Sequence, residues 1–422
     1  MADYEPPERG RQAQPEAAPL GESPGRREPS GKRGKSRKSG ASMGGKGEAA
    51  SGKAAPARGA SPQGRPANDV ADRAVHHNRL LPHHRQAYAA IDLGTNNCRL
   101  LIARPSGENF VVVDAFSRVV RLGEGLAHTG RLSDAAMDRA LGALHVCADK
   151  LRKRGVHLAR SVATEACRRA SNGADFIERV RAETGIRLDI ISAQEEARLA
   201  VLGCHILLET GEGPAMIFDI GGGSTELVLV EPGEAVPRIR DWQSVPWGVV
   251  SLTEATGRID DSDEARAEAY GAMRRRVRDS FARFEERIAP VREHADAHGN
   301  GRLLGTSGTV TTLASLHLAL PQYDRSAVDG LIVPADSMRQ ISMRLAAMTP
   351  AQRMALPCIG RERADLVVAG CAILETILDL WPATRLGVAD RGIREGILRA
   401  LMTAEGEAER SLAALRKTRQ GQ

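Results

Sequence analysis

The stretch that decides the fold of this chain is Ala215-Met-Ile-Phe-Asp-Ile-Gly-Gly-Gly-Ser-Thr-Glu-Leu-Val-Leu-Val230, which predicts a strand, a glycine turn and a returning strand. The same pattern occurs 127 residues earlier, in Ala89-Ala-Ile-Asp-Leu-Gly-Thr-Asn-Asn-Cys-Arg-Leu-Leu-Ile-Ala103. In each copy an aspartate, Asp92 or Asp219, ends the first strand, and a glycine follows two residues later. The repeat predicts two related halves that each open with a β-hairpin.

The two Asp-x-Gly turns combine a carboxylate with residues that suit phosphate binding. Glycine lets backbone N–H groups converge on an anion without a side-chain clash. A carboxylate at this place can hold a hydrated Mg²⁺ that neutralises the phosphate. Thr95, Asn96 and Ser224 follow and can donate hydrogen bonds to the same oxygens. The competing interpretation, two ordinary hairpin turns, is weakened because both copies are embedded in apolar strands.

Two adjacent glutamates follow a strand predicted at residues 188–191. Glu195 completes the capping-box pattern Ser192-x-x-Glu195 and therefore has a structural explanation. Glu196 has no such role, and a carboxylate there can accept a proton from a water that attacks phosphorus. The alternative is a surface glutamate stabilised by the helix dipole.

The residue seven positions after each aspartate is charged. Glu226 interrupts an apolar strand in the second copy, so it should face solvent or a site, as a second base, a metal ligand or a residue that positions water. Arg99 occupies the equivalent place in the first copy, where a guanidinium can grip phosphate with two hydrogen bonds.

Four motifs together resemble the exopolyphosphatase/guanosine pentaphosphate phosphatase (Ppx/GppA) family, in that family's order and over roughly residues 86–400. They are Asp92-Leu-Gly-Thr-Asn96, Ser192-x-x-Glu-Glu-Ala-Arg198, Asp219-Ile-Gly-Gly-Gly-Ser-Thr-Glu226 and Gly305-Thr-Ser-Gly308. The resemblance implies an α/β fold with two domains, the ribonuclease H-like fold of actin-like ATPases, sugar kinases and chaperone ATPases. In that fold, phosphate binds in the cleft between the domains.

The resemblance also implies a role for each motif residue. Glu196 resembles the general base and Glu226 the second essential acid, while Asp92 and Asp219 would bind Mg²⁺, with Mn²⁺ as a substitute. Arg99 is similar to an arginine that faces the terminal phosphate. The implied phosphate-binding residues are Gly94, Thr95, Asn96, Arg99, Gly221, Gly222, Gly223 and Ser224. Asp390-Arg-Gly-Ile-Arg-Glu-Gly396 matches a motif near the domain crossover, to which we assign no chemistry.

Composition divides the chain into four segments. Residues 1–85 are poor in large apolar residues and hold 16 Lys and Arg against 9 Asp and Glu, whereas the rest holds 43 against 44. We therefore expect a disordered basic tail over 1–85, which can contact polyanions or act only as a solubilising segment. The predicted domains are 86–200 and 201–403, and a charged tail follows over 404–422.

Several classes of protein are excluded by the sequence. It contains no run of about 18 apolar residues, which argues against a membrane span, and no apolar stretch near the N-terminus that would indicate a secretory signal. Its six cysteines form no C-x-x-C pair, so we expect a reduced, cytoplasmic protein without a zinc ribbon. Longer family members add a C-terminal helical domain of the HD type. This chain contains no His-Asp dipeptide, so the resemblance implies a short form without that domain. We expect this short form to be a homodimer.

Further elements are expected around these motifs. Ser133 should cap a helix that runs to about residue 153, and a long helix should span 262–288 with an apolar stripe. Arginines on that long helix either line a path for a polyanion or form its solvated back. The other expected elements are strands at 111–113, 158–163 and 384–388, and helices around 176–184, from 192 and after 392.

The resemblance favours an exopolyphosphatase, which would release orthophosphate from the end of inorganic polyphosphate with Mg²⁺. The alternative within the family is the 5′-phosphatase of guanosine pentaphosphate (pppGpp) in the stringent response. A kinase or ATPase of the same fold would share both Asp-x-Gly turns, but Glu196 beside the phosphates favours water as the acceptor. A non-catalytic polyanion sensor would not need both aspartates and both glutamates.

Overall fold

The structure is a computed structural model that describes residues 85–404 and 406, except for 108, 235, 261 and 362. The predicted basic tail therefore lies, apart from its last residue, outside the described residues, as does nearly all of the predicted C-terminal tail. Among the described residues, no helix has both the length and the apolar character that crossing a bilayer requires.

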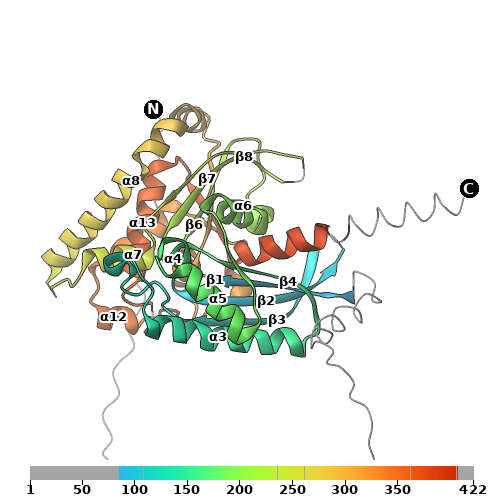
Figure 1. Ribbon diagram of the computed structural model, residues 1–422. Coiled ribbons are helices and arrows are strands. Elements are labelled where there is room, and N and C mark those ends of the chain that lie inside the picture. Colours follow the sequence, from blue (N-terminus) through green and yellow to red (C-terminus); the bar gives the residue numbers. More distant parts are fainter. Residues whose placement is uncertain are drawn as a thin grey trace, which may run out of the picture. The chain divides into compact units, whose positions relative to one another are not determined.

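The first half is built on a five-stranded sheet with the strand order β3-β2-β1-β4-β5 (Figure 1). Its first three strands are antiparallel, and β4 and β5 run parallel to β1. The strands are β1 (Ala87–Leu93), β2 (Asn97–Ser106), β3 (Asn109–Val119), β4 (Val156–Ala163) and β5 (Leu188–Ile190). The helices are α2 (Leu126–Thr129), α3 (Asp134–Lys153), α4 (Glu165–Arg169), α5 (Gly173–Thr184) and α6 (Ala193–Cys204), followed by the 3₁₀ turn η2 (His205–Leu207).

The second half repeats this arrangement in a six-stranded sheet with the order β10-β11-β9-β6-β7-β8. Here β6, β7 and β8 form the antiparallel meander, and β9 and β11 run parallel to β6 and to each other. The strands are β6 (Ala215–Ile220), β7 (Thr225–Glu231), β8 (Arg238–Val245), β9 (Arg302–Thr306), β10 (Ile332–Pro334) and β11 (Arg385–Ala389). The helices are α7 (Val249–Thr256), α8 (Asp263–Ala297), α9 (Gly308–His317), α10 (Arg325–Val328), α11 (Ala335–Ala347), α12 (Pro350–Met354) and α13 (Val367–Leu380), and residues 393–404 are also helical. The predicted pair of related halves is thus visible in the strand order.

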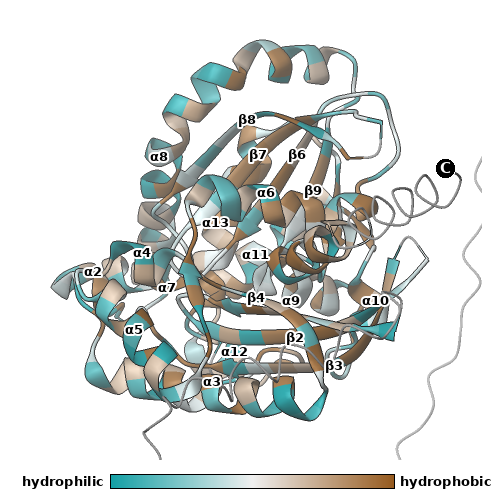
Figure 2. Cartoon of the chain, turned by 45° about the vertical axis from the view of Figure 1, so that its right-hand side comes forward, coloured by the Kyte–Doolittle hydropathy of each residue, from teal (hydrophilic) through white to brown (hydrophobic). Residues whose placement is uncertain are grey.

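The core of the second half lies between its sheet and the helices α8 and α13. In Figure 2 the strands β6, β7 and β9 are largely apolar, whereas α8 alternates between apolar and polar residues. The predicted stripe of α8 is buried, and it consists of Met273, Val277, Phe281, Phe284 and Ile288. Two arginines of this helix are engaged by protein: Arg274 pairs with Glu375 and Asp379 of α13, and Arg276 donates to the Ala255 carbonyl. The predicted end of the helix at residue 288 was wrong, because α8 continues through Pro290 to Ala297.

Other predicted elements agree with the structure. Ser133 caps α3 by accepting a hydrogen bond from the backbone N–H of Ala136 (3.3 Å). The predicted strands at 111–113, 158–163 and 384–388 correspond to β3, β4 and β11, although β3 is much longer than the pattern indicated.

Two helices pack between the sheets. One side of α6 and the helix at 393–404 form a cluster with the first sheet, in which Leu199 and Ile397 pack with Tyr88. The other side of α6 packs against the second sheet, where Val201 joins the cluster of Ile217. The predicted domain boundary at 200 therefore falls inside a helix that contacts both sheets, and the helix at 393–404, assigned to the second domain, packs against the first sheet.

Candidate active site

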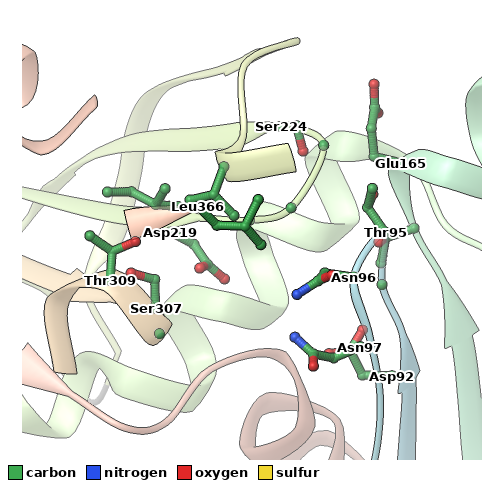
Figure 3. Close-up of a pocket in the computed structure, with 18 of the residues that line it drawn as sticks. Asp92, Thr95, Asn96, Asn97, Glu165, Asp219, Ser224, Ser307, Thr309 and Leu366 are labelled. Carbon is green, nitrogen blue, oxygen red and sulfur yellow. The ribbon is translucent and has the colours of Figure 1, made fainter. Parts of the chain in front are cut away.

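All twelve residues that the sequence assigned to catalysis, phosphate binding or metal binding line a single cavity of about 130 Å³ between the two hairpin turns. Figure 3 labels Asp92, Thr95, Asn96, Asp219 and Ser224 among them. They come from β1, β2, α6, β6 and β7 and the two turns. They are Asp92, Gly94, Thr95, Asn96, Arg99, Glu196, Asp219, Gly221, Gly222, Gly223, Ser224 and Glu226. Within each hairpin, β1 and β6 end beside the start of the strand that returns from the turn. The packing of the two halves then brings both turns and the start of α6 to the same cavity.

The two turns have the same backbone geometry. The N–H of Gly94 donates to the Asn97 carbonyl, and the N–H of Gly221 donates to the Ser224 carbonyl, both at 2.9 Å. Within the described part of the chain, the N–H groups of the two residues that follow each of these glycines donate to no protein acceptor. They belong to Thr95, Asn96, Gly222 and Gly223. Free N–H groups on two facing turns form a site for an anion such as phosphate.

The second turn needs its glycines because the first turn lies directly against it. A Cβ atom on Gly223 would lie 2.6 Å from Thr95 Oγ1, and a Cβ atom on Gly222 would lie 3.0 Å from Thr95 Cβ. A Cβ atom on Gly248, where α7 begins, would lie 2.4 Å from the Gly222 carbonyl carbon. Side chains at Gly222 and Gly223 would push the two turns apart, and a side chain at Gly248 would push α7 away from the second turn.

Both aspartates are half-buried carboxylates that line the cavity, and no described side chain forms an ion pair with either. Burial raises the pKa of Asp92, and burial together with Glu226 raises the pKa of Asp219 to about 8, while Arg99 opposes both shifts. Neither side chain accepts a hydrogen bond from the described part of the chain. In Figure 3 the side chain of Asn96 extends toward Asp219, and its Oδ1 atom is buried without a hydrogen-bond donor among the described residues.

These features fit a divalent cation. Two carboxylates and an unpaired amide oxygen are hard oxygen ligands, and Mg²⁺ is usually held by one or two carboxylates together with water and substrate phosphate. No group of three or more His, Cys, Asp or Glu side chains among the described residues is arranged to hold a metal ion by itself. An ion held by Asp92 and Asp219 would be completed by water and substrate phosphate.

Glu195 and Glu196 diverge from the start of α6. Ser192 caps the helix by accepting from the Glu195 N–H at 3.1 Å, as the sequence predicted. The predicted capping box is not completed, because the Glu195 carboxylate instead accepts hydrogen bonds from Arg160 and Arg198. Glu196 points into the cavity and is 7% exposed, so the prediction of a surface residue is excluded for it.

The carboxylate of Glu196 has a perturbed affinity for protons. Burial raises its pKa well above the ordinary range, and the neighbouring charge of Glu226 raises it further. Arg168 opposes these effects, since its Nη1 atom donates to Glu196 Oε2 at 3.0 Å. A buried carboxylate held by one arginine is well suited to exchange a proton with bound water.

Glu226 is tied to two hydroxyl groups. Ser224 donates to Glu226 Oε1 at 2.7 Å and Ser244 donates to the same oxygen at 3.0 Å. Burial raises the pKa of Glu226, and these two hydrogen bonds lower it. The hydroxyl of Ser224, which we predicted to bind phosphate, is therefore directed to Glu226 in this structure.

Sequence reasoning missed a carboxylate and an arginine that approach the cavity from α4. Glu165 lines the cavity, and Arg168 connects it to Glu196. Their signal was available, since Thr164-Glu165-Ala-Cys-Arg168 follows the end of a predicted strand as both glycine turns do.

A second cavity, of about 700 Å³, adjoins the first and shares Asp92, Arg99 and Asp219 with it. Its charged lining consists of six arginines, Arg99, Arg325, Arg361, Arg363, Arg391 and Arg394, and four acidic residues, Asp92, Asp219, Asp390 and Glu395. Ser307 and Gly308, from the fourth motif, line both cavities. The small cavity therefore adjoins a larger one in which arginines outnumber acidic residues, although Arg325 pairs with Asp390 and Glu395 and Arg391 pairs with Asp329.

Two facing phosphate turns, paired aspartates and buried glutamates between two related sheets define an enzyme that acts on phosphate esters or anhydrides. Residues 101–405 match the Ppx/GppA phosphatase family. Exopolyphosphatase 2 of Mycobacterium tuberculosis (strain ATCC 25618 / H37Rv) is 33% identical over 327 residues, which cover 74% of this chain and 98% of that protein.

Solved structures of related proteins also match the fold of this chain. The Ppx/GppA family member of Aquifex aeolicus is 27% identical with a TM-score of 0.60, and the match covers 76% of this chain and 98% of that one. An exopolyphosphatase-like protein is 28% identical with a TM-score of 0.65, over 75% and 97% of the two chains. The chain belongs to the Ppx/GppA phosphatase family, with the actin-like ATPase fold that the resemblance implied. It is an enzyme, a phosphoric anhydride hydrolase, from a family that generally depends on a divalent metal.

Proposed function

We propose that this enzyme is an exopolyphosphatase that removes the terminal phosphate of inorganic polyphosphate with Mg²⁺ and releases orthophosphate. One observation carries the proposal: the small cavity with free N–H groups adjoins the arginine-lined cavity. The first cavity offers a place for the terminal phosphate, and the second offers positive charge for the phosphates that follow. The relative from M. tuberculosis, named an exopolyphosphatase, supports the same assignment.

The proposed reaction is the attack of water on the terminal phosphorus. Glu196 accepts the proton of that water, because a buried carboxylate with a raised pKa binds a proton well near neutral pH. The N–H groups of Thr95, Asn96, Gly222 and Gly223 donate to the terminal phosphate oxygens, and Arg99 faces the same group.

Glu226 contributes negative charge beside Glu196 and Asp219, and we assign it to holding the attacking water through its carboxylate. Asp92 and Asp219 would hold Mg²⁺, which neutralises phosphate charge when it is bound. The remaining polyphosphate chain leaves toward the second cavity.

A second candidate, the pppGpp 5′-phosphatase, uses the same catalytic groups. The second cavity also contains the aromatic ring of Tyr323, which is 43% exposed, against which a guanine base can stack. A guanosine with its phosphates would then occupy the space that we assign to the polyphosphate chain.

The test is phosphate release by the purified full-length chain with long polyphosphate, tripolyphosphate, pppGpp or ATP, each with Mg²⁺. We expect kcat/KM to rise with chain length and to be highest for long polyphosphate, and we expect Glu196→Gln to lower kcat by roughly 10²- to 10⁴-fold. A higher kcat/KM for pppGpp than for long polyphosphate would support the second candidate instead. Phosphate transfer from ATP to an added acceptor, without release, would favour a kinase.

Mn²⁺ as an alternative ion, a homodimer, a cytoplasmic location and contact of the basic tail with polyanions stay predictions from the sequence.

A further inference from the structure

Arg168 lies between two carboxylates at the edge of the small cavity. Its Nε and Nη2 atoms donate to Glu165 Oε2 at 3.1 and 2.6 Å. Its Nη1 atom donates to the Ile191 carbonyl at 2.8 Å and to Glu196 Oε2 at 3.0 Å. Four hydrogen bonds to protein acceptors thus fix the guanidinium, whose side chain is only 22% exposed.

The fold places Glu165 against both halves of the site. Strand β4 pairs in parallel with β1, and the N–H of Thr164 donates to the Leu93 carbonyl, so α4 begins beside the first phosphate turn. A Cβ atom on Gly223 of the second turn would lie 3.0 Å from Glu165 Cγ. Glu165 therefore packs where the two turns meet, and Arg168 follows it one helical turn later.

An arginine beside a phosphate site would ordinarily grip the phosphate itself, since its planar fork matches phosphate oxygens. Here the fork is occupied by Glu165. The remaining nitrogen of the guanidinium, Nη1, donates to Glu196, the residue that we assign as the base. Among the described residues, Arg168 is the only cation within hydrogen-bonding distance of the Glu196 carboxylate. The contacts form one chain, Glu165–Arg168–Glu196.

We propose that Glu165 is a positioning residue for the reaction: it holds Arg168 on Glu196 and away from the substrate, which fixes the orientation of the Glu196 carboxylate. The inference rests on the proposed role of Glu196 as the base. Without Glu165, Arg168 loses two of its four hydrogen bonds and can turn toward the phosphates in the cavity. The base then loses its support, while substrate binding gains a cation.

The experiment compares Glu165→Ala, the isosteric Glu165→Gln and the control Glu183→Ala on long polyphosphate. Glu183 also accepts from an arginine (Arg179 Nε, 2.8 Å), but it lies on α5 outside both cavities. We expect Glu165→Ala to lower kcat by roughly 10- to 100-fold, the range for groups that orient a catalytic residue. KM should stay equal or fall, Glu165→Gln should lose less, and Glu183→Ala should match the wild type.

The double variant Glu165→Ala/Glu196→Gln separates positioning from other roles. If Glu165 acts through Glu196, adding Glu165→Ala to Glu196→Gln causes no further loss of kcat. Independent losses that multiply, a higher KM with an unchanged kcat, or wild-type kinetics in Glu165→Ala would each overturn the inference. Should Glu165→Ala lose its fold by circular dichroism, Glu165→Gln alone decides by the same criteria.

The activity of the wild type separates a failure of the proposed function from a failure of the proposed role of Glu165. A wild type that releases no phosphate from any of these substrates contradicts the proposed function, whereas an active wild type with unaffected Glu165 variants contradicts only the role of Glu165. If pppGpp is the better substrate, the same variants are measured on pppGpp with the same expectations.

Discussion

The two hairpins of this enzyme share a backbone but carry opposite charges at one equivalent position. Asp92 pairs across its hairpin with Arg99, whereas Asp219 pairs across its hairpin with Glu226. Burial raises the pKa of both aspartates; Arg99 opposes this rise in both, whereas Glu226 adds to it in Asp219. The first hairpin thus offers a cation to an anionic substrate, and the second gathers acidic groups that suit a metal ion and a water.

The turns also differ in how they are supported. The Thr95 carbonyl accepts from the Gly123 N–H, whereas the Gly221 and Gly222 carbonyls accept from the first residues of α7. One hydrogen bond, from the Gly125 N–H to Glu254 Oε1 at 3.0 Å, connects these two supports. The Thr95 side chain of the first turn occupies the space that Gly222 and Gly223 of the second turn leave free.

The largest effect should come from a residue that belongs to neither hairpin. We expect Glu196→Gln to lower kcat by roughly 10²- to 10⁴-fold, the usual size of a general-base contribution, with an unchanged melting temperature. Steady-state phosphate release and thermal unfolding measure both quantities. Glu195→Gln is the matched control, because its carboxylate points to Arg160 and Arg198. An inactive Glu195→Gln beside an active Glu196→Gln would show that the wrong carboxylate was chosen.

The asymmetry of the turns predicts a smaller but clear loss in Gly223→Ala. The added methyl group would meet Thr95 Oγ1 at 2.6 Å and separate the turns, so we expect kcat/KM to fall by about 100-fold. Gly94→Ala should lose less, because its Cβ would meet only the Asn97 carbonyl at an ordinary 3.6 Å. Gly142→Ala on α3, where nothing lies within 4 Å, serves as the control. Equal losses at the two turns would contradict the asymmetry.

The charge contrast predicts a pH-dependent effect of Mg²⁺ on stability. The pKa of Asp219 is raised to about 8, so below that pH the folded protein without metal keeps this proton, and a metal must displace it. Mg²⁺ affinity should therefore fall by about tenfold per pH unit below about 8. Melting temperatures with and without Mg²⁺ should differ more at about pH 9 than at about pH 6. The same shift in Asp219→Asn would mean that Mg²⁺ binds elsewhere.

We expect the smallest effect from the hydrogen bond between the Gly125 N–H and Glu254, which connects the segments that support the two turns. Glu254→Ala removes the acceptor of the Gly125 N–H, and one such hydrogen bond contributes about 1 kcal/mol, or roughly a fivefold effect. We expect KM to rise by about that factor with little change in kcat, because the segments that hold the two phosphate-binding turns are then less firmly connected. Kinetics of Glu254→Ala and of Glu264→Ala, an exposed residue of α8, test this. Identical KM values would show that the bond does not contribute to substrate binding.

Much of this site could be predicted from short-range sequence patterns alone. A glycine turn after an apolar strand depends on neighbouring residues, so Asp92, Asp219 and the glycines that follow them could be found from the sequence, and so could the duplication of the hairpin. The cap of α6 at Ser192 and the apolar stripe of α8 depend on local bonds and helical spacing in the same way.

Only the tertiary structure decided which groups meet across segments. The carboxylate of Glu195 turned to two arginines rather than back to the cap, Ser224 turned to Glu226, and Arg168 came to link Glu165 with Glu196. The packing of residues 393–404 against the first sheet is equally remote from local sequence. Hydrogen-bond partners and burial depend on how distant strands and helices pack, and together with neighbouring charges they set the proton affinity of each carboxylate.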